Sequence, residues 1–139
     1  MATFPLPRER GAIIVTLAFI TLAIPTFATA GKSLQTSTKN FDYGSVVLGD
    51  YGVQTFTFTN SGKSTITLSE TIVGTVTKGY GDFQFGIGSF CQAATLAPGE
   101  SCDAVVFFTP SMYGRRSATL VVAASDGSGA RVGLSGIGA

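Results

Sequence analysis

Apolar and polar residues alternate along several short stretches of this chain. In residues 54–60, Phe56 and Phe58 fall on one face of an extended chain and threonines fall on the other. A period of two, with aromatic and β-branched residues, predicts a strand. The same signal predicts strands over residues 41–49, 65–72, 83–87, 101–108 and 116–124, and a last strand around Val132 and Leu134. The polar residues 32–40 predict either a short first strand or an irregular lead-in.

Turn signals separate these strands. Glycine clusters with Asn, Asp or Ser at residues 49–52, 60–62 and 125–129, and Pro98-Gly99 marks another turn. Residues 73–81 have no clear pattern, and no stretch after residue 30 predicts a helix. About seven strands divided by turns predict an all-β fold, an immunoglobulin-like antiparallel β-sandwich.

Two residues interrupt the alternation inside predicted strands. Gly44 interrupts the strand over residues 41–49, which predicts a kink in an edge strand. Glu70 interrupts the apolar face of the strand over residues 65–72. A carboxylate is rarely placed in a core, so Glu70 predicts a bend or an edge position.

Residues 1–30 have the composition of a targeting segment. Two arginines precede an uncharged apolar run over residues 11–24, and Ala-Thr-Ala at 28–30 offers small residues to a signal peptidase. These features predict a secretory signal peptide. The run is shorter than the about 20 residues of a spanning helix, and an uncleaved membrane anchor is the alternative. The predicted organisation is a signal peptide, residues 1–30, and one immunoglobulin-like domain, residues 31–139.

Cys91 and Cys102 are the two cysteines of the chain, and the Pro98-Gly99 turn lies between them. In an exported domain of this size, an isolated pair is most often a disulfide bond. The alternative is a redox-active pair. That alternative lacks both the C-x-x-C spacing and a nearby histidine that would lower a thiol pKa. We therefore predict a structural disulfide between Cys91 and Cys102.

The sequence lacks the residue types on which most enzymes and metal sites depend. It has no histidine, which removes the commonest general base and the commonest metal ligand. The acids near turns lack the spacing of a calcium loop, and we expect solvated strand ends at Asp82, Glu100, Asp103 and Asp126. We expect no catalytic, cofactor-binding or metal-binding residues.

The basic residues do not point to nucleic acid. The formal net charge is +1, so the chain has no basic excess. Arg115 and Arg116 are adjacent at the start of a strand, which predicts a solvated edge. Gly62-Lys63-Ser64 has no glycine five residues before Gly62, so it predicts a hairpin turn and not a phosphate-binding loop.

Several motifs follow one another in a familiar order. They are F-D-Y-G-S-V-V-L-G from residue 41, T-F-T-F-T-N-S-G from residue 55, L-A-P-G-E-S-C ending at Cys102, and V-F-F-T-P ending at Pro110. Their order resembles the choice-of-anchor D and abnormal-spindle/hydin (ASH) type of immunoglobulin-like domains, relatives of the major-sperm-protein sandwich. The resemblance covers nearly all of residues 34–138. It implies a non-catalytic module, and it matches Cys91 and Cys102 to the cysteine pair of exported bacterial members.

Together these features predict an exported module that is secreted, periplasmic or held at the cell surface. We expect it to bind a protein or cell-envelope partner through sheet edges and end loops, and not to be an enzyme. The alternative function is a self-associating subunit of an extracellular filament or coat. Membrane contact is expected only through residues 1–30, if they are not cleaved.

Overall fold

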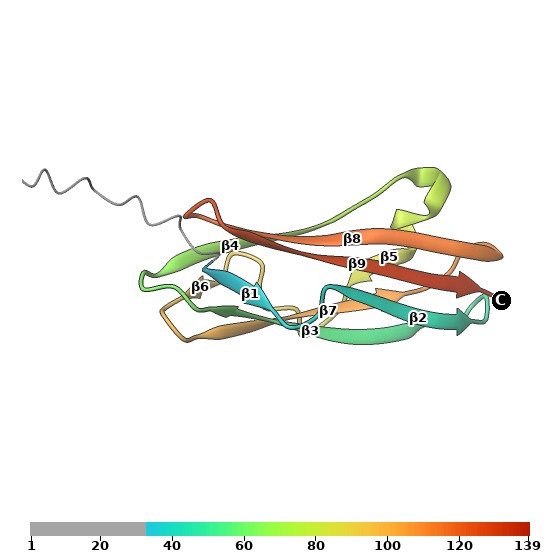
Figure 1. The fold of residues 1–139 in the computed structure, drawn as a ribbon. Helices are drawn as coiled ribbons and strands as arrows, with labels where there is room; N and C mark the ends of the chain where they lie inside the picture. The colour runs from blue at the N-terminus through green and yellow to red at the C-terminus, as the bar shows by residue number, and fades with distance from the viewer. Residues whose placement is uncertain (1–32) are drawn as a thin grey trace, which may run out of the picture.

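Two β-sheets pack face to face in the computed structural model, which describes residues 33–139 (Figure 1). The four-stranded sheet has the order β1-β3-β7-β5, with the bounds Leu34–Thr36, Gly52–Asn60, Ser101–Phe108 and Phe83–Phe85. The five-stranded sheet has the order β2-β9-β8-β4-β6, with the bounds Asn40–Val46, Gly129–Gly138, Gly114–Ala124, Ile66–Val73 and Thr95–Leu96. The predicted immunoglobulin-like sandwich is confirmed.

The described residues form nine strands, where the sequence predicts about seven. One of the two further strands, β1, has three residues and is the short first strand that was one alternative for residues 32–40. The other, β6, has two residues and is too short for a period of two to be recognised. The patternless residues 73–81 contain two 3-10 helices, η1 at Val76–Lys78 and η2 at Tyr80–Asp82. The predicted signal peptide, residues 1–30, lies outside the described residues.

The core lies between the two sheets and is built from the alternating positions. Phe56 and Phe58 are 1% and 0% exposed, as the strand pattern predicts. Burial of each such side chain contributes about 1.5–3 kcal/mol. Aromatic rings pack in this layer. Within the four-stranded sheet, Phe83 stacks on Phe108 with centroids 4.7 Å apart, and across the two sheets Phe41 meets Phe56 edge-on at 5.8 Å.

The first segment of the domain changes sheets along one long side of the sandwich. β1 pairs antiparallel with the end of β3, whereas β2 pairs parallel with β9 in the other sheet. Figure 1 shows β1 and β2 following one another along this side. The kink predicted at Gly44 is present, because Gly44 has a φ of 71° and the β2–β9 register shifts between Asp42 and Ser45.

Glu70 does not bend its strand. β4 runs unbroken from Ile66 to Val73, and the Glu70 side chain is on the buried face, with only 8% of the residue exposed. The expected bend is therefore absent, because the strand keeps its alternation and buries the carboxyl. The expected edge position is present, since β6 pairs with β4 only at Ile66 and Thr67.

Candidate functional site

The predicted disulfide is present and staples a loop to the four-stranded sheet. Cys91 and Cys102 are joined with their Cα atoms 5.3 Å apart. Cys102 lies on β7, opposite Phe58, and Cys91 lies in the connection between β5 and β6. We call residues 86–94 the stapled loop. Both sulfur-bearing residues are buried, so the bond is structural and does not present a reactive thiol.

The stapled loop completes the edge of β7. β5 pairs only with the last residues of that strand. Beyond it, the N–H of Gly86 donates to the carbonyl of Val105 at 2.9 Å, and the N–H of Phe90 donates to the carbonyl of Asp103 at 2.7 Å. Two carbonyl groups that β5 leaves uncovered on β7 therefore find donors in the loop.

The same loop reaches the edge of the five-stranded sheet. The N–H of Leu68 donates to the carbonyl of Ala94 at 2.8 Å, and the N–H of Glu70 donates to the side-chain oxygen of Gln92 at 2.9 Å. The Ser89 hydroxyl donates to Glu70 Oε1 at 2.8 Å, while the buried Oε2 has no hydrogen-bond partner within residues 33–139. Burial raises the pKa of Glu70 above its ordinary value. One long side of the sandwich is thus closed across both sheets.

The opposite long side is left partly open by the change of sheets. β1 covers β3 only at Phe58, Thr59 and Asn60. The Asn60 N–H donates toward β7, to Glu100, and the Ser61 N–H donates to the other side, to Ser33. Since these directions alternate along a strand, the backbone groups of Val53, Thr55 and Thr57 point away from β7. We call residues 53–57 the open edge.

Exposed apolar side chains lie beside the open edge. Val53 is 52% exposed and stands opposite Phe107 on the outer face of the four-stranded sheet. Tyr51 is 63% exposed, and its ring lies 5.3 Å from that of Phe107. Apolar side chains on this outer face therefore lie beside an edge that no strand of residues 33–139 covers, and an added strand uses both features.

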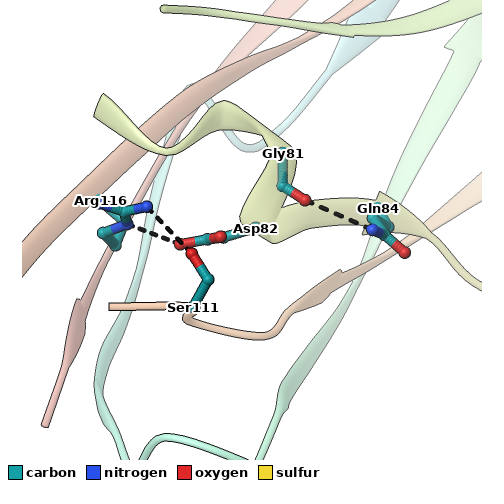
Figure 2. A network of polar contacts seen from close by, with 5 residues as sticks. All are labelled: Gly81, Asp82, Gln84, Ser111 and Arg116. Atoms are coloured by element: carbon teal, nitrogen blue, oxygen red, sulfur yellow. Dashed lines mark hydrogen bonds and ion pairs between the residues drawn. The ribbon is translucent and has the colours of Figure 1, made fainter. Parts of the chain in front are cut away.

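Asp82 and Arg116 form a buried ion pair, where the sequence predicts solvated residues at both positions. Arg116 Nε donates to Asp82 Oδ2 at 2.6 Å, and Nη2 donates to the Ser111 hydroxyl at 3.2 Å (Figure 2). Burial alone would raise the pKa of Asp82, but hydrogen bonds from Arg116 and Ser111 outweigh it and lower that pKa.

The prediction of solvation at Asp82 and Arg116 is wrong because the connection over residues 74–82 folds back onto β8. Gly79, at a φ of 71°, passes so close to the Arg116 guanidinium that a side chain there would overlap it. The Asp82 carbonyl also accepts the N–H of Thr109 at 2.8 Å. The pair therefore fixes the start of β5, and it is a structural feature. Its signal in the sequence was the pair of glycines 79 and 81, one on each side of Tyr80, which allow a tight connection.

The other acids serve their own turns and strands. Glu100 accepts the N–H of Ala97 at 2.7 Å across the Pro98-Gly99 turn. Asp103 accepts the Thr57 hydroxyl at 2.7 Å, and Asp126 accepts the N–H of Ser128 at 2.9 Å. Within residues 33–139, no three or more Cys, Asp or Glu side chains gather as metal ligands would. The same residues include no helix that is long and apolar enough to cross a membrane.

Comparison with known proteins finds a family model that matches this fold. Residues 33–137 match the family model described as HYDIN/CFA65/VesB-like, Ig-like domain. No match was found among curated proteins. The match supports the predicted ASH resemblance, while its choice-of-anchor D part stays a prediction.

Three solved structures show the same fold at low sequence identity. The ASH/PapD-like domain 7 of human CEP192 is 13% identical, with a TM-score of 0.63 over 79% of this chain and 87% of that one. The secreted serine protease VesC from Vibrio cholerae is 20% identical, with a TM-score of 0.57 over 77% of this chain and 23% of that one. The E. coli chaperone DraB is 12% identical, with a TM-score of 0.53 over 74% and 53%.

Proposed function

Because the chain belongs to the HYDIN/CFA65/VesB-like family of Ig-like domains, we propose that it is a non-catalytic binding module of the cell envelope or cell surface. It binds a protein or another envelope component through its strand edges and end loops. The observation that carries this proposal is the difference between its two long sides. The stapled loop closes one side, whereas on the other side no strand of residues 33–139 pairs with residues 53–57 of β3.

Three features support a place outside the cytoplasm. Disulfides persist in oxidising compartments, and Cys91 is bonded to Cys102 in this domain. Residues 1–30 carry the predicted signal peptide. VesC, which shares the fold, is described as secreted. Mass spectrometry of the exported protein tests this part: we expect an N-terminus at Gly31 and a mass lower by two hydrogens. An intact N-terminus or free thiols would contradict it.

The chemistry of the described residues supports a non-catalytic role. The buried ionisable groups are Glu70, Asp82 and Arg116, and each is engaged in holding a connection to the sandwich. VesC is a protease, but the similarity covers only 23% of its chain, so its activity gives no reason to assign catalysis here. Loss of a measured activity on mutating an Asp or Glu would overturn this part.

Capture of partners from the envelope tests the binding role. The exported protein, carrying an affinity tag, is incubated with envelope extract at low and moderate salt, cross-linked and recovered. We expect a reproducible envelope component that is absent when a tag-only control is used. Recovery of no component at any salt concentration would contradict the proposal.

A second candidate function is a self-associating subunit of a filament or coat. The exposed Tyr51 and Val53, together with a strand edge that lacks charge, favour it. Light scattering at increasing protein concentration discriminates the two functions. Growth of the scattering mass with concentration supports self-association, and a strict monomer at high concentration excludes it.

A further inference from the structure

Among the strands of residues 33–139, none lies beside residues 53–57 of β3 on the side away from β7, because β2 leaves this place. β1 runs antiparallel to β3 and pairs Leu34 with Asn60 and Thr36 with Phe58. A chain that continued in the same direction would pass opposite Phe56 and Gln54. Instead the Thr36 hydroxyl lies 3.4 Å from the carbonyl oxygen and the N–H nitrogen of Thr38, and the chain crosses to pair Asn40 with Gly133. The change of sheets therefore leaves one strand position of the four-stranded sheet unfilled.

The vacant position is lined by backbone groups at strand spacing. Val53, Thr55 and Thr57 direct their N–H and C=O groups into it, because the even-numbered residues of β3 face β7. Among the described residues, the Thr55 carbonyl accepts only the Gln54 side-chain amide, at 3.0 Å. Donors and acceptors that repeat every second residue match the backbone of an extended polypeptide.

The open edge also lacks the protection that natural edge strands usually carry. Gly52–Asn60 has the sequence GVQTFTFTN, with no charged residue and no proline. Its register with β7 runs without a shift from Gly52 to Thr59, so no bulge twists the edge away. Charges, prolines and bulges are the common means of preventing strand addition.

The corresponding open stretch of the five-stranded sheet is protected. β2 pairs with β9 only from Gly133 onward, so among the described strands residues 129–131 have a neighbour only in β8, on their other side. Lys39 and Arg131 line the groove beside that stretch. Two like charges at an edge disfavour the approach of a neutral strand. The two open stretches of this side therefore differ in charge. Charged side chains lie beside residues 129–131, whereas residues 53–57 contain none.

We propose that residues 53–57 bind a neutral extended segment of a partner protein, which adds to the four-stranded sheet antiparallel to β3 in the place that β2 vacates. This inference rests on the proposed function and names its site and partner class. A segment with apolar side chains at alternate positions suits the site, since its outward side chains would meet Val53, and Tyr51 lies beside it, both exposed. A charged segment would gain no ion pair from Gly52–Asn60.

A second copy of this chain fits the site less well. Two copies of β3 paired antiparallel about Thr55 would set Val53 of one opposite Thr57 of the other. Gly52 of the second copy would then stand opposite Phe58. Thr36 already occupies the position opposite Phe58. Pairing along the whole open edge is therefore blocked by β1, whereas a free segment can end before it.

A neutral peptide probe tests the site directly. The peptide acetyl-Val-Thr-Val-Thr-Val-amide is added in excess to the exported protein, and hydrogen exchange is followed at each amide by NMR. We expect exchange to slow about fivefold or more at Val53, Thr55 and Thr57. The amide of Thr59, already covered by β1, and those of residues 129–131 should not change. No slowing at residues 53–57, or slowing at another edge instead, would overturn the inference.

Two variants and a matched control extend the test to the captured envelope partner. Val53→Lys puts a charge on the open edge, and Thr55→Pro removes one of its donors. Thr59→Lys puts the same charge on the same strand and face, where β1 covers the backbone. We expect Val53→Lys and Thr55→Pro to reduce peptide and partner binding about tenfold, and Thr59→Lys to leave both unchanged. Circular dichroism checks that each variant is folded.

The peptide experiment and the partner capture together distinguish an incorrect binding site from an incorrect proposed function. If the wild-type protein captures a partner that all three variants retain, the binding role stands and the site is wrong. If the peptide slows exchange at residues 53–57 but no partner is captured, the site stands and the proposed function is wrong. Equal loss of binding in Val53→Lys and Thr59→Lys would also overturn the site, because a general charge effect would then explain it.

Discussion

The two long sides of the sandwich differ in how the backbone hydrogen-bonding groups at the sheet edges are covered. On one side, the stapled loop covers the edges of β7 and β4 with backbone and side-chain hydrogen bonds and a disulfide. On the other side, one segment divides itself between β3 and β9, and it pairs with only the last three residues of β3 and with β9 from Gly133 onward. The two sheets have four edges in total. The stapled loop closes two of these edges, and the other two are left to the one segment that crosses between the sheets as β1 and β2.

The difference shows that coverage of an edge does not require a strand. The Gln92 side chain accepts the Glu70 N–H in the place where a strand carbonyl would stand. In contrast, the open side has strands on it and still leaves backbone groups exposed, because β1 is three residues long. Edge protection is therefore to be judged from hydrogen-bond partners, and the strand order alone does not give it.

Loss of the ion pair that anchors the closed side should have the largest effect on stability. Arg116→Met leaves Asp82 buried without its cation, and breaking such a pair costs about 3–5 kcal/mol. The pKa of Asp82 is lowered from 3.8, so the unfolded chain takes up the proton first as the pH falls. The contribution of Asp82 is complete above about pH 4 and is lost as the pH falls through the folded pKa. Urea unfolding against pH measures both effects.

A double variant provides the control for this prediction. Arg116→Met with Asp82→Asn removes both charges and should recover part of the lost stability. If the single variant is as stable as the wild type at neutral pH, the pair does not anchor β5. If the double variant is no more stable than the single one, the loss reflects packing of the Arg116 side chain and not an unpaired carboxylate.

Removal of the staple should have the next largest effect. Cys102→Ser opens a loop with a sequence separation of 11, and the expected loss is about 2–4 kcal/mol of unfolding free energy. Thermal unfolding followed by circular dichroism should show a lower midpoint, and reductant should lower the wild-type midpoint equally. The variant itself should not respond to reductant. An unchanged midpoint in both cases would mean that the hydrogen bonds of the stapled loop suffice without the covalent bond.

A pair of proline variants distinguishes the closed face of β3 from its open edge. Gln54 faces β7 through its backbone, so Gln54→Pro removes a ladder hydrogen bond and should cost about 3 kcal/mol. Thr55 directs its N–H into the vacant position, so Thr55→Pro should cost only about 1 kcal/mol. Both residues are adjacent and neither side chain is fully buried. Equal losses in urea unfolding would show that the Thr55 N–H already has a partner.

The sequence predicts the two sheets and the disulfide but not the coverage of the edges. Alternation placed Phe56 and Phe58 in the core because strand geometry repeats every two residues. The chain has two cysteines, so a disulfide within it could join only Cys91 with Cys102. These inferences depend on local pattern and composition, which a single sequence contains.

Long-range placement accounts for what the sequence did not predict. Asp82 and Arg116 are 34 positions apart, and no local pattern relates an acid before one strand to an arginine on another. The vacancy beside residues 53–57 depends on β2 pairing with β9, a contact between the two ends of the domain. A polar lead-in over residues 32–40 gives no signal for a change of sheets, because pairing is decided by which edge is available.

The smallest expected effect on stability concerns Glu70, whose carboxyl group is buried on the closed side. Its pKa is raised from 4.5, so the folded chain holds the proton more tightly, and this contribution is present below about pH 4.5 and lost as the pH rises through the folded pKa. Glu70→Gln keeps an acceptor for Ser89 and removes the charge. It should stabilise the fold by about 1 kcal/mol at neutral pH and by nothing near pH 4.

Urea unfolding of Glu70→Gln and wild type at about pH 4 and about pH 7 measures this difference. Asp50→Asn, which removes an exposed carboxyl, is the control and should change stability at neither pH. A Glu70→Gln variant that is less stable than wild type at neutral pH would mean that the ionised carboxylate holds the stapled loop. In that case the closed side would depend on charge as well as on the disulfide, and acid would loosen it.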